Sequence, residues 1–144
     1  MKCRIFVCGF LIAVMVCLMN AYAGPVDYIA LLKRPHSGTP QRIVYGSQPD
    51  QFGELWLPEN VKAPIPVVVL IHGGCWLASL PGLEMMNPMA EDLSTHGVAV
   101  WNIEYRRLGM EGGGYPGTFL DVANGIDTLN KIAADHHLDL SKLQ

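Results

Sequence analysis

Apolar and polar positions along the chain predict a β-hairpin followed by strands and helices in turn. Two short apolar runs, at 42–45 and 52–57, flank turn-type residues at 46–50, which is typical of a β-hairpin. The run from Val67 to Ile71 is continuous and rich in β-branched side chains, so it predicts a strand buried on both faces of a sheet. The run from Val98 to Ile103 predicts a second buried strand.

Two helices are predicted on either side of this second strand. Asn87 followed by Pro88 is typical of an N-cap with proline at the first helical position, and Gly97 suits the residue after the helix. Thr118 and Asp121 have the spacing of a capping box for the next helix. The expected apolar faces are Met89, Ala90 and Leu93 for the first helix, and Phe119, Val122, Ala123, Ile126 and Ala133 for the second, which should end near Asp135.

This order of elements predicts an α/β fold, with a β-hairpin followed by parallel strands and flanking helices in three αβα layers. Residues 24–41 contain three prolines and indicate an irregular lead-in with a short helix at 26–32, so the domain should occupy 42–144. The pattern calls for another buried strand where the sequence stops. We therefore expect one open sheet edge, which favours self-association with another chain.

The N-terminus has the layout of a secretory signal peptide over residues 1–23. Two basic residues precede an apolar run at 5–19, and Ala-Tyr-Ala at 21–23 provides a small-x-small cleavage site. This predicts a secreted or periplasmic protein without membrane insertion after cleavage. An uncleaved anchor is an alternative, but the run is shorter than the roughly 18 to 20 residues of a spanning helix. Lipoprotein processing at Cys17 is a weaker one, because no small residue precedes that cysteine.

Composition limits the partners and the redox chemistry of the chain. Half of the 144 residues are hydrophobic and 16% are charged, which suits one globular domain. The net charge of −3 becomes −5 once the two basic residues of the signal are removed (−3 − 2). The sequence contains no basic stripe, so nucleic acid is not expected as a partner. Three of the four cysteines lie in the signal, so Cys75 alone remains and no intrachain disulfide can form.

The stretch with the most chemical information is Ile-His-Gly-Gly-Cys-Trp at 71–76, directly after the first buried run. Gly73 and Gly74 at the end of a strand let the backbone turn tightly and point N–H groups into open space. Acyl transfer needs such donors, because its tetrahedral intermediate carries an oxyanion. The alternative is a tight turn of no chemical significance.

In this stretch the chain resembles the α/β-hydrolase superfamily, in its esterase, lipase and kynurenine-formamidase-like branch, whose oxyanion loop carries an HGG motif. The segment 100–107 (VWNIEYRR) resembles the strand that follows in these enzymes, and 113–122 (GGYPGTFLDV) resembles their loop into the next helix. The resemblance covers roughly 51–144. It implies hydrolysis of a small-molecule ester or amide through a serine acyl-enzyme, without a metal or organic cofactor.

The resemblance also implies a role for each residue of the HGG stretch. The backbone N–H groups of Gly74 and Cys75 would be the oxyanion donors, and Gly73 would permit the turn. His72 would brace the loop by hydrogen bonding rather than act as the catalytic base. Trp76 would line the acyl or leaving-group pocket.

The nucleophile of this family lies on a G-x-S-x-G elbow further along the chain, followed by an acid and a late histidine. No such elbow occurs here, because every serine after the signal lacks the flanking glycines: Ser37, Ser47, Ser79, Ser94 and Ser141. The chain is therefore expected to be the oxyanion-hole half of the fold, truncated before the elbow and inactive by itself. The alternative is a non-catalytic remnant or binding module that keeps this half. Peptidase, formamidase and carboxylesterase are not separated.

Other residues have competing interpretations. Cys75 could be a nucleophile with His72 as its base, but a small loop residue that contributes its backbone is favoured. His136 and His137 could suggest a metal site, but adjacent histidines point about 100° apart on a helix and lack a carboxylate pair at ligand spacing, so no metal is expected. The glycines at 112–114 favour a flexible loop near the active-site rim over a phosphate cradle.

Charged and methionine side chains near the predicted strand ends also have two interpretations. Glu104, Arg106 and Arg107 follow the second buried run and could bind an anionic substrate, although structural pairing or solvent exposure is favoured there. The methionines of the first helical region are expected to pack against the sheet: Met85, Met86 and Met89.

Overall fold

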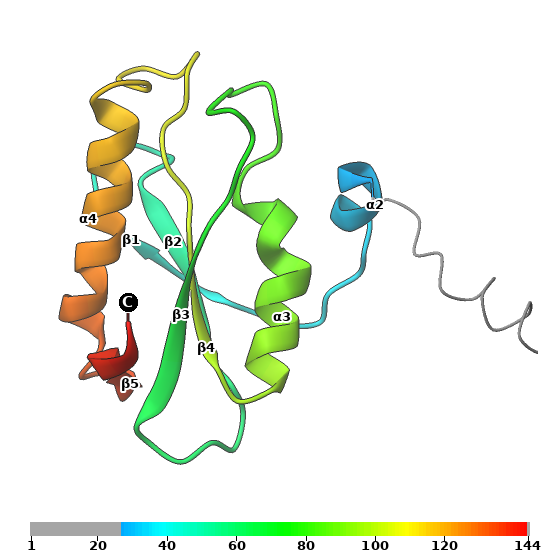
Figure 1. Ribbon diagram of the computed structural model, residues 1–144, viewed down its shortest axis with the longest axis vertical. Coiled ribbons are helices and arrows are strands. Elements are labelled where there is room, and N and C mark those ends of the chain that lie inside the picture. Colours follow the sequence, from blue (N-terminus) through cyan, green and yellow to red (C-terminus); the bar gives the residue numbers. More distant parts are fainter. Residues whose placement is uncertain (1–26, 144) are drawn as a thin grey trace, which may run out of the picture.

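A computed structural model describes residues 27–143 of the chain (Figure 1). The predicted signal peptide lies outside these residues. The lead-in contains a five-residue helix, α2 (Tyr28–Leu32), whose N-cap Asp27 accepts a hydrogen bond from the Ile29 amide. Within the described part of the chain, no helix is both long enough and apolar enough to cross a membrane.

Five strands form one mixed sheet in the order β1-β2-β4-β3-β5. The strands are β1 (Gln41–Val44), β2 (Phe52–Trp56), β3 (Ile65–Ile71), β4 (Ala99–Ile103) and β5 (Leu138–Asp139). The first two form the predicted hairpin, β2 runs antiparallel to β4, and β3 runs parallel to both β4 and β5. The hairpin and both buried runs of the sequence are therefore confirmed as strands.

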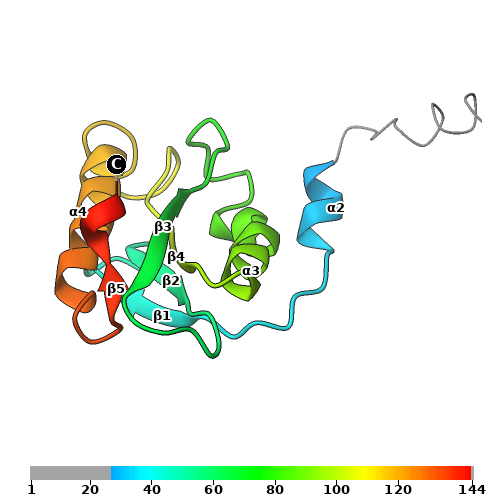
Figure 2. The same ribbon diagram turned by 60° about the horizontal axis from the view of Figure 1, so that its bottom comes forward.

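Helices cover both faces of the sheet, as the three-layer prediction requires (Figures 1 and 2). The 3₁₀ turn η1 (Leu83–Met86) and α3 (Asn87–Thr95) lie on one face, and α4 (Gly117–Ile132) lies on the other. Each face has its own core. Leu55, Trp101, Ile103 and Leu129 belong to the cluster on the α4 side, whereas Trp56, Leu70, Ala90 and Val100 belong to the cluster on the α3 side.

The expectation that β3 is buried on both faces is wrong. Every residue of β4 is buried, but Val68 and Ile71 of β3 are 38% and 46% exposed. The reason is that β5 pairs with β3 only at Ile65 and Pro66, so the rest of the outer edge of β3 has no partner strand among residues 27–143. Self-association through this edge stays a prediction.

The start of α3 differs from its prediction by one position. Met86 is the N-cap, and Asn87 is already helical because η1 leads directly into α3. The Asn87 side chain instead accepts a hydrogen bond from Asn102 of β4, at 3.3 Å. Met89 is 53% exposed rather than packed on the sheet, whereas Met86 contacts the core. Gly97 has a φ of +86° directly after the helix, which confirms its predicted position.

The buried face of α4 is also not the predicted one. Phe119 and Ile126 are exposed, and the face against the sheet carries mostly small or polar residues: Thr118, Asp121, Gly125, Thr128 and Leu129. Gly125 allows close approach, since a β-carbon there would lie 2.9 Å from the Ile103 side chain. Its carbonyl also accepts a hydrogen bond from the Trp101 indole at 2.8 Å.

Gly53→Ala is expected to lower the free energy of unfolding by about 1–3 kcal/mol through overpacking. A β-carbon at Gly53 would lie 2.4 Å from the ring of Trp101, which is fully buried and fixed by its bond to Gly125. Urea unfolding followed by circular dichroism measures the change. Gly73→Ala is the matched control, because a β-carbon there meets no atom within 4 Å. Equal losses in the two variants would contradict the packing argument.

Candidate functional site

The candidate site lies where the parallel strands β3 and β4 end. The segment after β3 and the segment after β4 run side by side and are joined by a bridge between Leu77 and Leu108. The Leu108 amide donates to the Trp76 carbonyl at 2.6 Å, and the Ala78 amide donates to the Leu108 carbonyl at 2.9 Å. Carboxyl ends of parallel strands are the usual place for ligand sites in α/β sheets.

The turn after β3 has a backbone that most side chains avoid. Gly74, Cys75 and Trp76 have φ values of +116°, +52° and +58°. Positive φ is uncommon for residues other than glycine and persists only where the surroundings hold it. Among residues 27–143, no protein group accepts a hydrogen bond from the Gly74 or Cys75 amide, although the Gly74 carbonyl accepts one from Leu77 at 3.0 Å. Both amides therefore have no acceptor within the described part of the chain, in a segment where Gly74 is half-buried and Cys75 is exposed.

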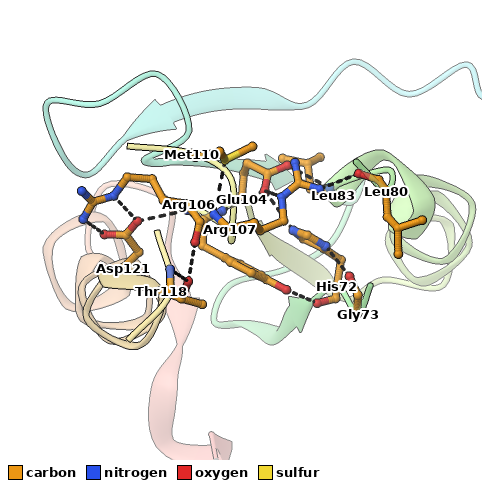
Figure 3. Close-up of polar contacts among 12 residues, drawn as sticks. His72, Gly73, Leu80, Leu83, Glu104, Arg106, Arg107, Met110, Thr118 and Asp121 are labelled. Atoms are coloured by element: carbon orange, nitrogen blue, oxygen red, sulfur yellow. Dashed lines mark hydrogen bonds and ion pairs between the residues drawn. The ribbon is translucent and has the colours of Figure 1, made fainter. Parts of the chain in front are cut away.

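A buried pair of side chains, His72 and Glu104, joins the start of this turn to the segment after β4 (Figure 3). Ile71 and Ile103 are paired in the β3–β4 register, so the next residue of each strand, His72 and Glu104, stands at the same level. The His72 Nε2 atom lies 2.9 Å from Glu104 Oε1, and its Nδ1 atom lies 2.8 Å from the Gly73 carbonyl. Only 2% of His72 and 5% of Glu104 is exposed.

Glu104 accepts more than one hydrogen bond. Besides His72, the backbone amides of Tyr105 and Leu83 donate to its carboxylate at 2.9 and 3.1 Å. Burial alone raises the pKa of Glu104, but the hydrogen bonds from His72 and these amides outweigh it and leave the pKa below its ordinary value. Glu104 is therefore an anion at neutral pH.

Tyr105 and Tyr45 complete the support of the pair. The Tyr105 hydroxyl donates to the His72 carbonyl at 2.6 Å, and its ring stacks on the imidazole with centroids 4.3 Å apart and planes 10° apart. The Tyr45 hydroxyl donates to the Glu104 carbonyl at 2.6 Å. His72 is thus held at its backbone carbonyl, at its ring face and through the contact of its side chain with Glu104.

A buried ion pair between Arg106 and Asp121 fixes the start of α4. Arg106 binds Asp121 through Nε at 2.7 Å and Nη2 at 2.8 Å, and Gln51 donates to the same carboxylate at 2.6 Å. Thr118 donates its hydroxyl to the Arg106 carbonyl and accepts the Gly114 amide. The predicted capping box is therefore wrong, because both of its side chains bind the loop after β4 rather than the ends of their own helix.

The charged residues after β4 form structural pairs, as favoured from the sequence. Arg107 is buried, donates to the Leu80 carbonyl at 2.7 Å and has its Nε atom 3.7 Å from Glu104. Cys75 is exposed and has no disulfide. Since Glu104 and the Gly73 carbonyl occupy both nitrogens of His72, that ring is not placed to activate the Cys75 thiol. Among residues 27–143, no group of three or more His, Cys, Asp or Glu side chains could hold a metal ion.

Sequence reasoning missed an aromatic group beside the turn. The Trp76 ring contacts the Phe119 ring edge-on, with centroids 5.4 Å apart, and Phe119 contacts Tyr115 at 5.9 Å. Trp76 and Phe119 are each half exposed and Tyr115 is 89% exposed. The helical period assigned Phe119 to the core, and no pattern in the sequence separates it from a core residue.

A mixed sheet of this strand order, with helices on both faces and an HGG turn after β3, defines the α/β-hydrolase class. Comparison with known proteins agrees: the chain belongs to the BD-FAE family, whose model matches residues 54–144.

Similar proteins include several esterases. A probable isoprenylcysteine alpha-carbonyl methylesterase of Arabidopsis thaliana is 29% identical over 101 residues, which is 70% of this chain and 20% of that protein. Among solved structures, a bacterial heroin esterase has a TM-score of 0.61 at 22% identity, over 90% of this chain and 38% of its own. Esterase B of Lactobacillus rhamnosis has a TM-score of 0.67 at 21% identity, over 92% and 42%. The chain thus spans about a fifth of the curated relative and less than half of each esterase structure.

Asp121→Asn is expected to lower the free energy of unfolding at pH 7 by about 3 kcal/mol, because it removes the charge that compensates a largely buried Arg106. Burial raises the pKa of Asp121, but hydrogen bonds from Arg106 and Gln51 outweigh it and lower the pKa below its ordinary value. A lowered folded pKa gives stability that is complete above the unfolded pKa of about 3.9 and is lost as pH falls through the folded pKa. The difference between variant and wild type should therefore shrink below about pH 4.

Urea unfolding of both proteins at several pH values between neutral and strongly acid measures this difference. Asp127→Asn is the matched control, since Asp127 is exposed on the same helix. A difference between Asp121→Asn and wild type that stays constant down to acid pH would contradict the role assigned to the ion pair.

Proposed function

We propose that this chain carries the oxyanion-stabilising half of a serine hydrolase that cleaves a small-molecule ester or amide bond. The observation that supports the proposal most directly is the pair of amides on Gly74 and Cys75. They stand at the carboxyl end of β3 without an acceptor among residues 27–143. Backbone donors fixed in advance are what a tetrahedral intermediate needs, because they stabilise its charge without reorganising.

The remaining roles follow from the same turn. Gly74, with a φ of +116°, allows the backbone to turn after the strand, whereas the space at Gly73 would also admit a β-carbon. His72 braces the turn through its bond to Glu104 rather than serving as the base. Trp76, half exposed and in contact with Phe119, lines the pocket for the acyl or leaving group. No metal or organic cofactor takes part in this chemistry.

The nucleophile, the acid and the base would come from sequence beyond Gln144, so we expect the 144-residue chain alone to turn over no p-nitrophenyl ester. The coding sequence that follows Gln144 is the first test. A G-x-S-x-G elbow and a late histidine would support the proposal, whereas their absence would favour the non-catalytic remnant or binding module.

If the frame continues, Cys75→Ala in the whole product discriminates a backbone donor from a thiol nucleophile. Because alanine keeps the amide, kcat/KM should fall by less than about tenfold, or about 1.4 kcal/mol. Loss of a true nucleophile costs about 10⁶-fold in kcat in a serine protease. Ester hydrolysis and its inhibition by a serine-reactive phosphonate are the measurements. Loss of all activity in Cys75→Ala with the fold intact would overturn the proposal.

We also propose export of this chain to the periplasm or the medium, on the layout of its first 23 residues. The mature protein should begin at Gly24. Intact-mass measurement of protein recovered from the periplasm or medium of a bacterial expression host checks this. A product that keeps Met1 and stays with the membrane fraction would favour the uncleaved anchor.

A further inference from the structure

The turn that offers the Gly74 and Cys75 amides is held from its two ends. On the far end, Trp76 and Ala78 are bonded to Leu108 of the neighbouring segment. On the near end, the chain enters through His72, whose side chain, ring face and carbonyl are all engaged. Between these anchors the described structure contains one internal bond, from Leu77 to the Gly74 carbonyl. A backbone with three successive positive φ values must therefore be kept in place by its ends.

We propose that Glu104 is a positioning residue of this turn: its carboxylate fixes His72 and, through His72, the aim of the Gly74 and Cys75 amides. The inference rests on the proposed function, because aim matters only if those amides meet a developing oxyanion.

The surroundings of Glu104 are arranged for geometry more than for stability. The carboxylate joins three separate pieces of chain, since it accepts from His72 after β3, from Leu83 in η1 and from Tyr105 after β4. The chain also leaves room for it at Gly82, where a β-carbon would clash with Glu104 Oε2. Burying a carboxylate costs several kcal/mol, which offsets much of what its hydrogen bonds contribute to stability, so the three donors act chiefly on the arrangement of the chain around it.

Glu104 and Tyr105 contact different atoms of His72, so the effect of removing one can be separated from the effect of removing the other. Glu104 acts on the imidazole through Nε2, whereas Tyr105 acts on the same residue through the His72 carbonyl and the ring face. Arg107 lies 3.7 Å from the carboxylate and satisfies a different partner, the Leu80 carbonyl. Removing the charge of Glu104 should therefore loosen His72 while the strands and the Tyr105 contacts remain.

The test uses the isotope-labelled chain from Gly24 to Gln144 and nuclear magnetic resonance. In Glu104→Gln, the ring nitrogen signals of His72 should shift, and the amide signals of Gly74 and Cys75 should shift or broaden several-fold more than in the control. The control is Glu91→Gln, because Glu91 also accepts hydrogen bonds from backbone amides, those of Ser37 and Gly38, but in the lead-in. The ring signals report whether the contact between Glu104 and the imidazole has changed, and the amide signals report whether that change reaches the turn, which a merely structural role of Glu104 would not produce.

A shift of the His72 ring signals with the Gly74 and Cys75 amides unmoved would overturn the inference. If Glu104→Gln fails to fold, Glu104→Asp keeps the charge but shortens the side chain that reaches His72 Nε2, and its effect on the two amides decides the question in the same way. An inactive whole-frame product in which the amides respond to Glu104 would reject the hydrolase and keep the positioning role. An active whole-frame product in which the amides do not respond to Glu104 would keep the hydrolase and reject the positioning role.

Discussion

Burying the Glu104 carboxylate at the end of β4 removes a charge from water, and the surrounding structure has to compensate it. The penalty for one such ion is several kcal/mol even after relaxation. His72 and two backbone amides donate to the carboxylate, and Arg107 stands near it. The β3–β4 register already brings His72 to the level of Glu104, and the carboxylate adds a link to the η1 turn through the Leu83 amide. One buried anion therefore ties together the end of β3, the η1 turn and the end of β4.

The same end of the sheet contains the strained part of the backbone. Cys75 and Trp76 have positive φ without being glycine, which costs about 1–3 kcal/mol for each residue. The Gly74 and Cys75 amides donate to no group among residues 27–143, so no hydrogen bond from them offsets the cost of the positive φ angles. The compensation comes from the contacts of His72 with Glu104 and Tyr105 before the turn, and from the backbone bonds to Leu108 after it. A structure that maintains both the strain and the unpaired donors is consistent with selection for a site rather than for stability alone.

The main features of the fold can be predicted because they depend on apolar runs, whereas the errors arise where polar contacts replace apolar ones. Thr118 and Asp121 have capping-box spacing, but they bind Arg106, which lies 12 and 15 residues away along the chain. The His72–Glu104 pair is within reach of the sequence, because each residue follows an apolar run and parallel neighbours end at the same sheet edge. The positive φ angles of Cys75 and Trp76 are not within reach, because no sequence pattern specifies them at residues other than glycine.

The location of these contacts bears on how the turn at 74–76 is built. Every group that holds the turn lies between Tyr45 and Asp121, on the hairpin, the central parallel strands and the start of α4. The exposed side of β3 takes no part in it, whereas Phe119 on the exposed face of α4 contacts the Trp76 ring. Residues that cover those surfaces in a longer chain would add apolar burial, but the aim of the amides is already set by the polar contacts at the strand ends. The turn can therefore form independently of the nucleophile that it would serve, so its geometry is informative in a chain that lacks the G-x-S-x-G elbow.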